Sequence, residues 1–517
     1  MGVLIGVGNT VPQFPYQDLW YGILINLKNH GHSVADGKLQ RVGNLDLHRT
    51  LPIQSRIKRF MANADGTVNY WLGANDSTVK EGGGAARLNA VDGDVQLYKP
   101  DYYRKFELIG EDYLLVAISE VALPGFVRMK EKARSPWLAT FNRTTNVPVS
   151  ASFLQWNADN TLKVDADGLP VLTSNAAEYR GGNNNTTYDG KYNSLLGMPA
   201  SSANKSTIRT RCKTKGENWH HGGWRFREEM GWLMAIEFGD LSSDTAFTAE
   251  KTADGFAQGG LGINTAVNWS ELSTHNGNNP LYPCGITAKL GNNTGMVEYT
   301  IKNWAGTGKD KVMHVCSYRG WEQPKQHLWE HNDDVIVHVN KPSEGGERII
   351  YLCSDPAKFT TPADKAAAVP DGYVELGRLP DNEGYISAMG VANGYTFPSS
   401  VDGGAANKDY GDYYWRPAVT DDNGAEGFYQ LLAAAFAVYS DHSGVRCANT
   451  NNRGANTNAN YGFPLLRLCG FSLCCALTAI RNYIETKLPR PCLTKAATGM
   501  AQPRMLYADT CCTLAKE

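Results

Sequence analysis

The sequence has almost no net charge, no long apolar run and no recognisable export signal. Its 50 Lys and Arg nearly balance 52 Asp and Glu, for a formal charge of -2, so no long-range field attracts nucleic acid or an anionic membrane. No stretch approaches the roughly 18 apolar residues of a membrane span. The opening residues MGVLIGVGNTVPQF lack the basic region, full apolar segment and cleavage site of a signal peptide. We therefore expect a protein made in the cytoplasm, with no nucleic-acid partner and no membrane insertion.

Paired cysteine motifs and long helical periods are also scarce. The 11 cysteines are scattered, odd in number and form no pair of CxxC motifs, which argues against a zinc ribbon or a disulfide framework and favours free buried thiols. Several of them crowd between Cys469 and Cys512, which marks a compositional break near Gly470. Gly (53), Tyr (25) and Trp (12) are abundant instead. This composition predicts an α+β fold that is β-rich and loop-rich.

Turn signals divide the chain into three expected parts. Short β-like runs such as DVQLYKP and DYLLVAIS recur over residues 1–134 and predict a β-rich module for attachment or assembly. Pro and Asn signals after Ser135 predict a junction. A second domain is expected over residues 135–470, followed by a Cys-rich extension over 471–517. Helical spacing predicts a helix in GWRFREEMGWLMAIEFG, from Gly223, and short strands are expected from Val312 onward.

An asparagine cluster between two apolar stretches is the most unusual feature. In GVRCANTNNRGANTNANYGF the asparagines recur every second residue, a spacing that puts them on one face of a strand. Asn452-Arg453-Gly454 lies between the two runs, and Asn and Gly tolerate the positive φ of a tight turn. The pattern therefore predicts a hairpin with a face of short amides. A disordered polar linker fits the apolar flanks and the period less well, and a stacked asparagine ladder would need repeats that are absent.

Such a surface suits recognition better than catalysis, because exposed amides donate and accept hydrogen bonds and can change without loss of the fold. The residues just upstream mix aromatic and small polar side chains, as antibody paratopes do. We expect a shallow ligand-binding surface in which Phe436 and Tyr439 supply apolar contacts. The candidate binding residues are Phe436, Val438, Tyr439, Ser440, Asp441, His442, Ser443, Asn449, Asn451, Asn452, Asn456, Asn458 and Asn460.

The run AAAFAVYSDHSGVRCANTNNRGANTNANYGF resembles the variable region of proteins diversified by diversity-generating retroelements. That family displays the region on a C-type-lectin-like, formylglycine-generating-enzyme-like domain used by phage tail receptor-binding proteins. SYRGWEQPKQHLWEHNDDVIV from Ser317 and the segment from Phe397 resemble its framework. The resemblance places the variable region at about 431–463 and implies that template asparagine codons are copied with errors at adenines. It assigns Trp321, Trp329 and Trp415 to the scaffold, while Pro464 departs from the arginine common in the family.

The resemblance implies a phage tail fibre protein that binds a receptor on the host bacterial surface, either a glycan or a protein. It further implies other tail proteins as partners, a homotrimer, a location in the virion after synthesis in the host cytoplasm, and neither catalysis nor a cofactor or metal. Three alternatives remain. They are a copper-dependent oxidase of the same fold using Cys447, a tail-associated glycan depolymerase using Glu330 with Asp333 or Asp334, and a bacterial surface adhesin with the same domain.

Weaker signals have simpler interpretations. Gly6-x-Gly8 lacks the third glycine of a dinucleotide site, and His220-His221 cannot form the i, i+4 face of a zinc site. The loops beginning at Asp165 and Asp421 resemble calcium loops without the distal bidentate glutamate. None of these residues is expected to bind a cofactor or a metal.

Overall fold

The computed structural model describes residues 14–417 and 426–467. Strands predominate in these ranges, joined by long loops, and this confirms the predicted β-rich, loop-rich α+β class. The α-helices described are α1 (Leu45–Thr50), α2 (Lys205–Lys213), α3 (Trp224–Phe238) and α4 (Trp269–Asn276). In these ranges every helix is too short or too polar to cross a bilayer.

Two antiparallel sheets contain most strands of the N-terminal part. One has the order β2-β1-β7-β6-β8, with β1 at Trp20–Asn26, β2 at Leu39–Gly43, β6 at Tyr102–Ile109, β7 at Tyr113–Ser119 and β8 at Val127–Met129. The other has the order β13-β28-β9-β5-β3-β4, with β3 at Lys58–Ala62, β4 at Val68–Trp71, β5 at Asp94–Lys99, β9 at Lys132–Arg134, β13 at Trp219–His221 and β28 at Leu465–Arg467. The runs DVQLYKP and DYLLVAIS form β5 and β7, as predicted.

A mixed sheet of later strands carries the segments of functional interest. Its path is β20-β19-β18-β24-β26-β23-β21-β22, and β27 adds to β18. The strands are β18 (Trp329–Val339), β19 (Arg348–Cys353), β20 (Tyr373–Arg378), β21 (Gly384–Ala392), β22 (Tyr395–Asp402), β23 (Tyr413–Trp415), β24 (Gly427–Ala433), β26 (Ala448–Asn452) and β27 (Tyr461–Gly462). The strands expected after Val312 are therefore present.

Smaller sheets complete the strand inventory of the described ranges. The strands β10 (Thr140–Asn142), β11 (Pro148–Val149) and β12 (Tyr179–Arg180) form one, and β14 (Gly295–Ile301), β15 (Lys311–Tyr318) and β16 (Trp321–Glu322) form another. The parallel pair β17 (Gln326–His327) and β25 (Ala435–Phe436) leads into the candidate binding segment.

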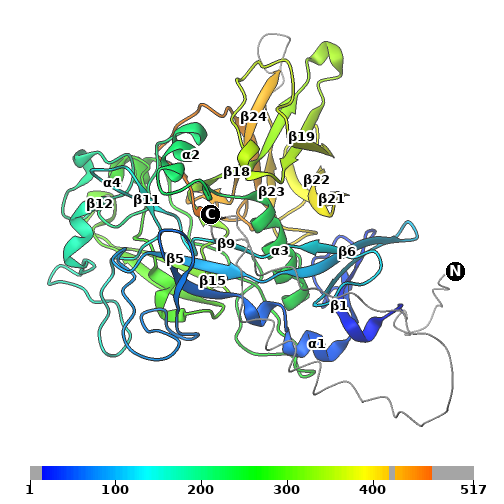
Figure 1. The fold of residues 1–517 in the computed structure, drawn as a ribbon, viewed down its shortest axis with the longest axis horizontal. Helices are drawn as coiled ribbons and strands as arrows, with labels where there is room; N and C mark the ends of the chain where they lie inside the picture. Colours follow the sequence, from blue (N-terminus) through cyan, green and yellow to red (C-terminus); the bar gives the residue numbers. More distant parts are fainter. Residues whose placement is uncertain (1–13, 418–425, 468–517) are drawn as a thin grey trace, which may run out of the picture. The chain divides into compact units, whose positions relative to one another are not determined.

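Helix α3 lies at the centre of this architecture, between β6 and β9 on one side and strands of the mixed sheet on the other (Figure 1). Its N-terminus is capped by the Asp334 carboxylate, which accepts hydrogen bonds from the backbone N–H of Trp224 (2.7 Å) and Arg225 (3.2 Å). It ends at Gly239, whose φ of 66° is easy for glycine. All of its side chains are buried. The predicted helix is thus confirmed as a core element.

The charged residues of α3 are buried in ion pairs with strands from both parts of the chain. Glu229 pairs with Lys99 of β5 (2.9 Å) and Lys132 of β9 (2.5 Å). Glu228 pairs with Arg104 of β6 (2.8 Å). Losing one partner of such a pair typically costs about 3–5 kcal/mol, because the other charge is left buried and unpaired. These pairs join the expected N-terminal module to the centre of the expected second domain.

The expected boundary between residues 134 and 135 does not separate two bodies. Strand β9 ends at Arg134 and pairs with β5 on one side and with β28, from the end of the described chain, on the other. Residues 1–470 form one compact unit. The Pro and Asn signals after Ser135 mark a loop rather than a linker. The predicted extension over 471–517 lies outside the described residues.

Candidate ligand-binding surface

The candidate binding segment enters from a buried strand pair. Phe436 bridges His327 in the parallel pair β17–β25, and its side chain has no exposed surface. Its ring packs 5.0 Å from that of Trp269. The backbone then continues in fixed contacts, since Ala437 N–H donates to the His327 carbonyl (3.2 Å). Phe436 is therefore a core residue, and the prediction that it offers an exposed apolar contact is wrong. It lies within a strand whose neighbours cover both faces.

Residues 437–447, here called the display loop, are held equally firmly at their far end. The Arg446 guanidinium is buried and donates to the carbonyls of Leu241 (2.8 Å) and Gly231 (2.7 Å). The Arg446 backbone N–H donates to the buried Asp412 carboxylate (3.0 Å). Ser443, predicted to be a surface residue, is buried and its hydroxyl donates to the Ser440 carbonyl (2.8 Å). The loop thus hangs between two immobile ends.

Between these ends the side chains reach solvent. Asp441 is exposed, and Val438, Tyr439, Ser440 and His442 are half-buried. These are the residues of the predicted set that the display loop presents outward. Their backbone path is set by buried neighbours, so their side chains can differ without a change in the core.

Six rings form a continuous aromatic cluster beneath and beside the display loop: Trp329, Tyr385, Tyr413, Trp415, Tyr439 and His442. The Trp415 ring lies 5.3 Å from Tyr439 and 4.8 Å from Trp329, centroid to centroid. His442 stacks on Tyr413 at 4.2 Å. Such contacts contribute about 0.5–1.5 kcal/mol per pair beyond burial. The display loop is therefore packed on rings supplied by β18, β21 and β23.

The sequence did not point to Tyr385 or Tyr413 as part of this surface, and it assigned Trp415 and Trp329 to the scaffold alone. Both tryptophans are buried, at 8% and 4% exposure, yet both contact Tyr439. Tyr385 and Tyr413 are half-buried. The dense aromatic stretch DYYW, starting at Asp412, was the available signal. Its relation to the display loop depends on the pairing of β23 with β21 and β26, which no local pattern reveals.

The asparagines divide into buried and exposed members. Asn449 and Asn460 are 5% and 4% exposed, which contradicts their prediction as surface residues. Asn451, Asn456 and Asn458 are exposed, and Asn452 is half-buried. Asn449 is enclosed because β26 lies between β24 and β23, where it pairs with Leu432 and Trp415. Only the end of β26 projects its amides toward solvent.

The predicted asparagine hairpin is absent from the described structure. Strand β26 pairs with β24 and β23, whereas β27 pairs in parallel with β18. Residues 453–460, here called the asparagine loop, connect them through a turn in which Asn456 N–H donates to the Arg453 carbonyl (3.1 Å). Distant strands outcompete the local pairing because they bury the apolar side chains that flank the asparagines.

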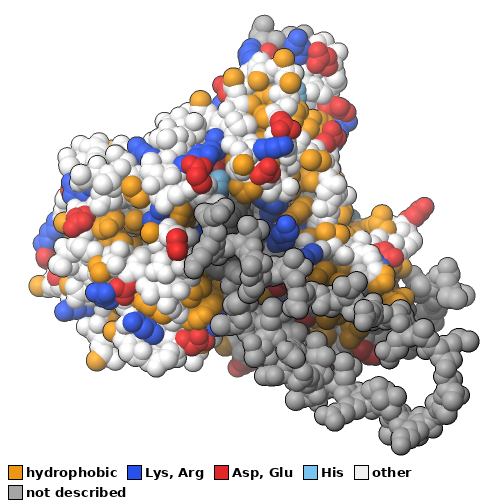
Figure 2. All heavy atoms as spheres, viewed as in Figure 1, with side chains coloured by type: hydrophobic (Ala, Val, Ile, Leu, Met, Phe, Trp, Pro, Cys, Tyr) orange, Lys and Arg blue, Asp and Glu red, His pale blue; other side chains and the backbone are white. Residues whose placement is uncertain are grey.

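Hydrogen bonds connect the amides to one another and to the aromatic cluster. The Asn449 side-chain oxygen accepts from the Asn452 amide (3.0 Å) and from Asn451 N–H (3.2 Å). The Tyr461 hydroxyl donates to the Asn452 side-chain oxygen (2.5 Å). Because Asn449 pairs with Trp415, whose ring contacts Tyr439, the exposed amides and the display loop belong to one connected surface. On the face seen in Figure 2, basic and acidic side chains are interspersed.

The carboxylates proposed for glycan hydrolysis are structural. Glu330 pairs with Arg134 (3.1 Å) and Arg227 (3.0 Å), and the charges of these arginines lower its pKa against the opposing effect of burial. Asp333 pairs with Arg209 (2.5 Å), and Asp334 caps α3. All three are buried and lie on β18 rather than on a solvated loop. A glycan cannot reach them without unfolding the sheet.

Cys447 is a poor candidate for the copper chemistry of the oxidase alternative. Burial raises the pKa of its thiol well above the usual value, and the charge of Asp412 raises it further. The thiol donates to the His442 carbonyl (3.1 Å). The described cysteines, Cys212, Cys284, Cys316, Cys353 and Cys447, are buried and free, as predicted. Cys447 serves to hold the display loop.

The remaining polar signals are also explained by packing. His220 and His221 lie in β13 and are buried, with His221 3.3 Å from Asp333. The Asp165 carboxylate closes a turn by accepting from Leu169 N–H (2.9 Å). Residues Gly6, Gly8 and Asp421 lie outside the described ranges. His30, Asp402 and Asp409 approach one another, but Lys38 already neutralises Asp409 at 2.5 Å.

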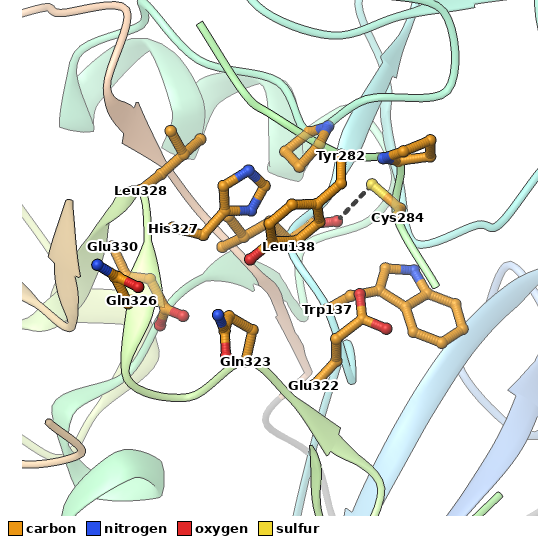
Figure 3. Close-up of a pocket in the computed structure, with 12 residues that line it drawn as sticks. Trp137, Leu138, Tyr282, Cys284, Glu322, Gln323, Gln326, His327, Leu328 and Glu330 are labelled. Carbon is orange, nitrogen blue, oxygen red and sulfur yellow. Dashed lines mark hydrogen bonds between the residues drawn. The ribbon is translucent and has the colours of Figure 1, made fainter. Parts of the chain in front are cut away.

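A small interior cavity lies between Trp137, Tyr282, His327 and Glu322 (Figure 3). The Tyr282 ring stacks on His327 at 3.8 Å, and the Cys284 thiol donates to the Leu138 carbonyl (3.2 Å). Burial lowers the pKa of His327 to about 3. The cavity measures about 10 Å³, which leaves room for about one water molecule. It is part of the packed core below the display loop.

Comparison of the chain with protein-family models and with curated proteins gives no match.

Proposed function

We propose that the protein is a phage tail fibre protein that binds a receptor on the host bacterial surface through a diversified surface. The single observation that carries the proposal is the contrast within the display loop. Its ends, at Phe436 and Arg446, are buried, whereas Val438–His442 reach solvent. A segment built in this way can change its outward side chains at little cost to the fold, since exposed substitutions usually shift stability by less than about 0.5 kcal/mol.

The resemblance of this segment to retroelement-diversified variable regions supports the same proposal. Asn451, Asn456 and Asn458 are exposed, and an error at an adenine of an asparagine codon would alter a side chain in contact with solvent. Buried Asn449 and Asn460 lie outside the part of the surface available to a ligand. The proposed binding residues are therefore Val438, Tyr439, Ser440, Asp441, His442, Asn451, Asn452, Asn456 and Asn458.

Binding through such a surface is expected to be weak at a single site, so several copies must act together. Linking sites can increase the overall affinity by roughly two to four orders of magnitude without a new contact. We therefore include a homotrimer, assembled with other tail proteins in the virion, in the proposal.

The proposal is tested by a matched pair of substitutions. Tyr439→Ala removes a half-buried ring from the display loop, whereas Phe436→Ala removes a core ring three residues earlier. We expect Tyr439→Ala to lose adhesion to host cells while its melting temperature stays within a few degrees. Phe436→Ala should cost about 3–5 kcal/mol. Full adhesion by a folded Tyr439→Ala protein would contradict the proposal.

A further inference from the structure

Two exposed carboxylates flank the aromatic cluster at opposite ends. Tyr385 pairs with Tyr413, and Gly384 pairs with Tyr414, in the antiparallel register of β21 and β23. One residue further, this register brings Glu383 beside Trp415, on the same face as Tyr385. Asp441 lies at the other end, next to Tyr385. Both acids are exposed.

The charges of these acids act on the rings. Burial raises the pKa of Tyr413 and of Tyr439, and the Glu383 carboxylate raises both further. Burial also raises the pKa of Tyr385, and the Asp441 carboxylate adds to this effect. The acids therefore lie close enough to the aromatic cluster to set its local potential.

Neither acid is neutralised within the part of the chain that the structure describes. The ion pairs of residues 14–417 and 426–467 include neither Glu383 nor Asp441, and the contact printed for Asp441 is with the Ser440 hydroxyl (3.3 Å). Arg416 follows Tyr414 in the strand alternation, and its charge acts on Tyr414 and Arg348, away from Tyr413 and Trp415. The surface therefore combines aromatic rings with uncompensated negative charge.

We propose that the aromatic cluster, with Glu383 and Asp441, binds a quaternary ammonium group of the ligand. The faces of Tyr and Trp rings attract cations, and a quaternary ammonium needs no hydrogen-bond acceptor in return. Two carboxylates add favourable charge at a distance. A primary ammonium is more strongly hydrated and suits this surface less. The inference rests on the proposed function, because it names the chemistry of the ligand at the same surface.

Isothermal titration of the full-length protein with choline chloride, at constant ionic strength, tests the inference. We expect saturable binding of choline and none of 3,3-dimethylbutan-1-ol, its uncharged carbon analogue. Lysine should bind more weakly than choline. Equal binding of choline and its uncharged analogue would overturn the inference, as would tighter binding of lysine, because either result removes the role assigned to the quaternary charge.

Variants assign the binding to this surface. Tyr439→Leu keeps an apolar side chain but removes the ring, and Glu383→Gln removes one charge. Each should weaken choline binding by roughly threefold to thirtyfold, the range expected for one cation–π contact. Glu250→Gln, at an exposed acid elsewhere, should leave it unchanged. Equal affinity in all three variants would overturn the assignment, provided that near-ultraviolet circular dichroism shows each to be folded.

Host adhesion, measured on the same variants, separates this inference from the proposed function. Loss of adhesion in Tyr439→Leu without any choline binding by the parent protein would leave receptor binding standing and reject the quaternary ammonium. Choline binding by a protein that does not adhere to host cells would support the cation site and reject the proposed function.

Discussion

The imidazole of His442 stacks on the phenol ring of Tyr413, with ring centroids 4.2 Å apart and planes at 22°. Tyr413 belongs to β23, in the middle of the mixed sheet, whereas His442 belongs to the display loop. A residue available to a ligand is thus held in place by a residue of the framework. The same relationship recurs between Trp415 and Tyr439, so the order of the loop depends on rings that the loop itself does not supply.

Replacing Tyr413 by Ala should loosen the display loop without unfolding the protein. Loss of ring contacts worth about 0.5–1.5 kcal/mol each should speed amide hydrogen exchange in residues 438–443 by about twofold to tenfold. Exchange in α3 should stay the same. Tyr192→Ala, at a half-buried ring elsewhere, serves as the control. Unchanged exchange in the loop of Tyr413→Ala would show that the stacking does not order it.

Asn449 and Asn451 offer a matched test of the divided asparagine cluster. Asn449 is buried and its side-chain oxygen accepts two hydrogen bonds, so Asn449→Ala should lower the free energy of unfolding by about 1–3 kcal/mol. Asn451 is exposed, and Asn451→Ala should change it by less than about 0.5 kcal/mol. Urea denaturation measures both. Equal effects would contradict the placement of Asn449 between β24 and β23.

Arg446 should be essential for stability rather than for binding. Arg446→Met removes the donors to the Gly231 and Leu241 carbonyls and leaves Asp412 buried beside an uncharged side chain. We expect a loss of about 3–5 kcal/mol. The double variant with Asp412→Asn should recover part of it, because burial already raises the pKa of Asp412 to about 7 despite the opposing charge of Arg446. A double variant no more stable than Arg446→Met would contradict this coupling.

Acid should destabilise the framework through its buried histidines. Burial lowers the pKa of His331 to about 3, from an ordinary value of 6.5. The unfolded chain therefore takes up a proton below pH 6.5 that the folded protein refuses, and the free energy of unfolding falls as the pH drops from 6.5 toward 3. One such group contributes up to about 1.4 kcal/mol per pH unit.

The variant His331→Gln isolates this contribution. Glutamine can still donate to the Gln430 side-chain oxygen, which lies 2.8 Å from His331 Nδ1, but it does not titrate. Urea denaturation at pH 7, 6 and 5 should give a shallower decline in the variant than in the parent protein. Parallel declines would show that His331 gains its proton equally in both states.

Local periodicity predicted the elements whose partners lie nearby in the sequence. The helix from Gly223 was predicted because its apolar residues recur at helical spacing, and β5, β7 and β18 were predicted from short apolar or alternating runs. Each forms as expected. Their signals come from side chains that must be buried wherever the element finally packs.

Burial in the candidate site could not be predicted in the same way. Phe436 and Asn449 have the same local patterns as their exposed neighbours, and they are enclosed only because β17, β23 and β24 come from elsewhere in the chain. The missed boundary after Arg134 has the same cause, since β9 pairs with a strand more than three hundred residues later. Glu383 and Tyr385 joined the surface through sheet register alone.

The central claim is that the display loop and the exposed amides can vary freely on a fixed framework. The most direct measurement is the thermal melting of one variant in which Val438, Tyr439, Asp441, His442, Asn451 and Asn456 are all replaced by other residues, Ser or Ala, with its host adhesion recorded alongside. We predict a melting temperature within about 5 °C of the parent protein, since these six are exposed or half-buried, together with lost or redirected adhesion. A variant that unfolds, or one that still adheres to the same host, would contradict the claim.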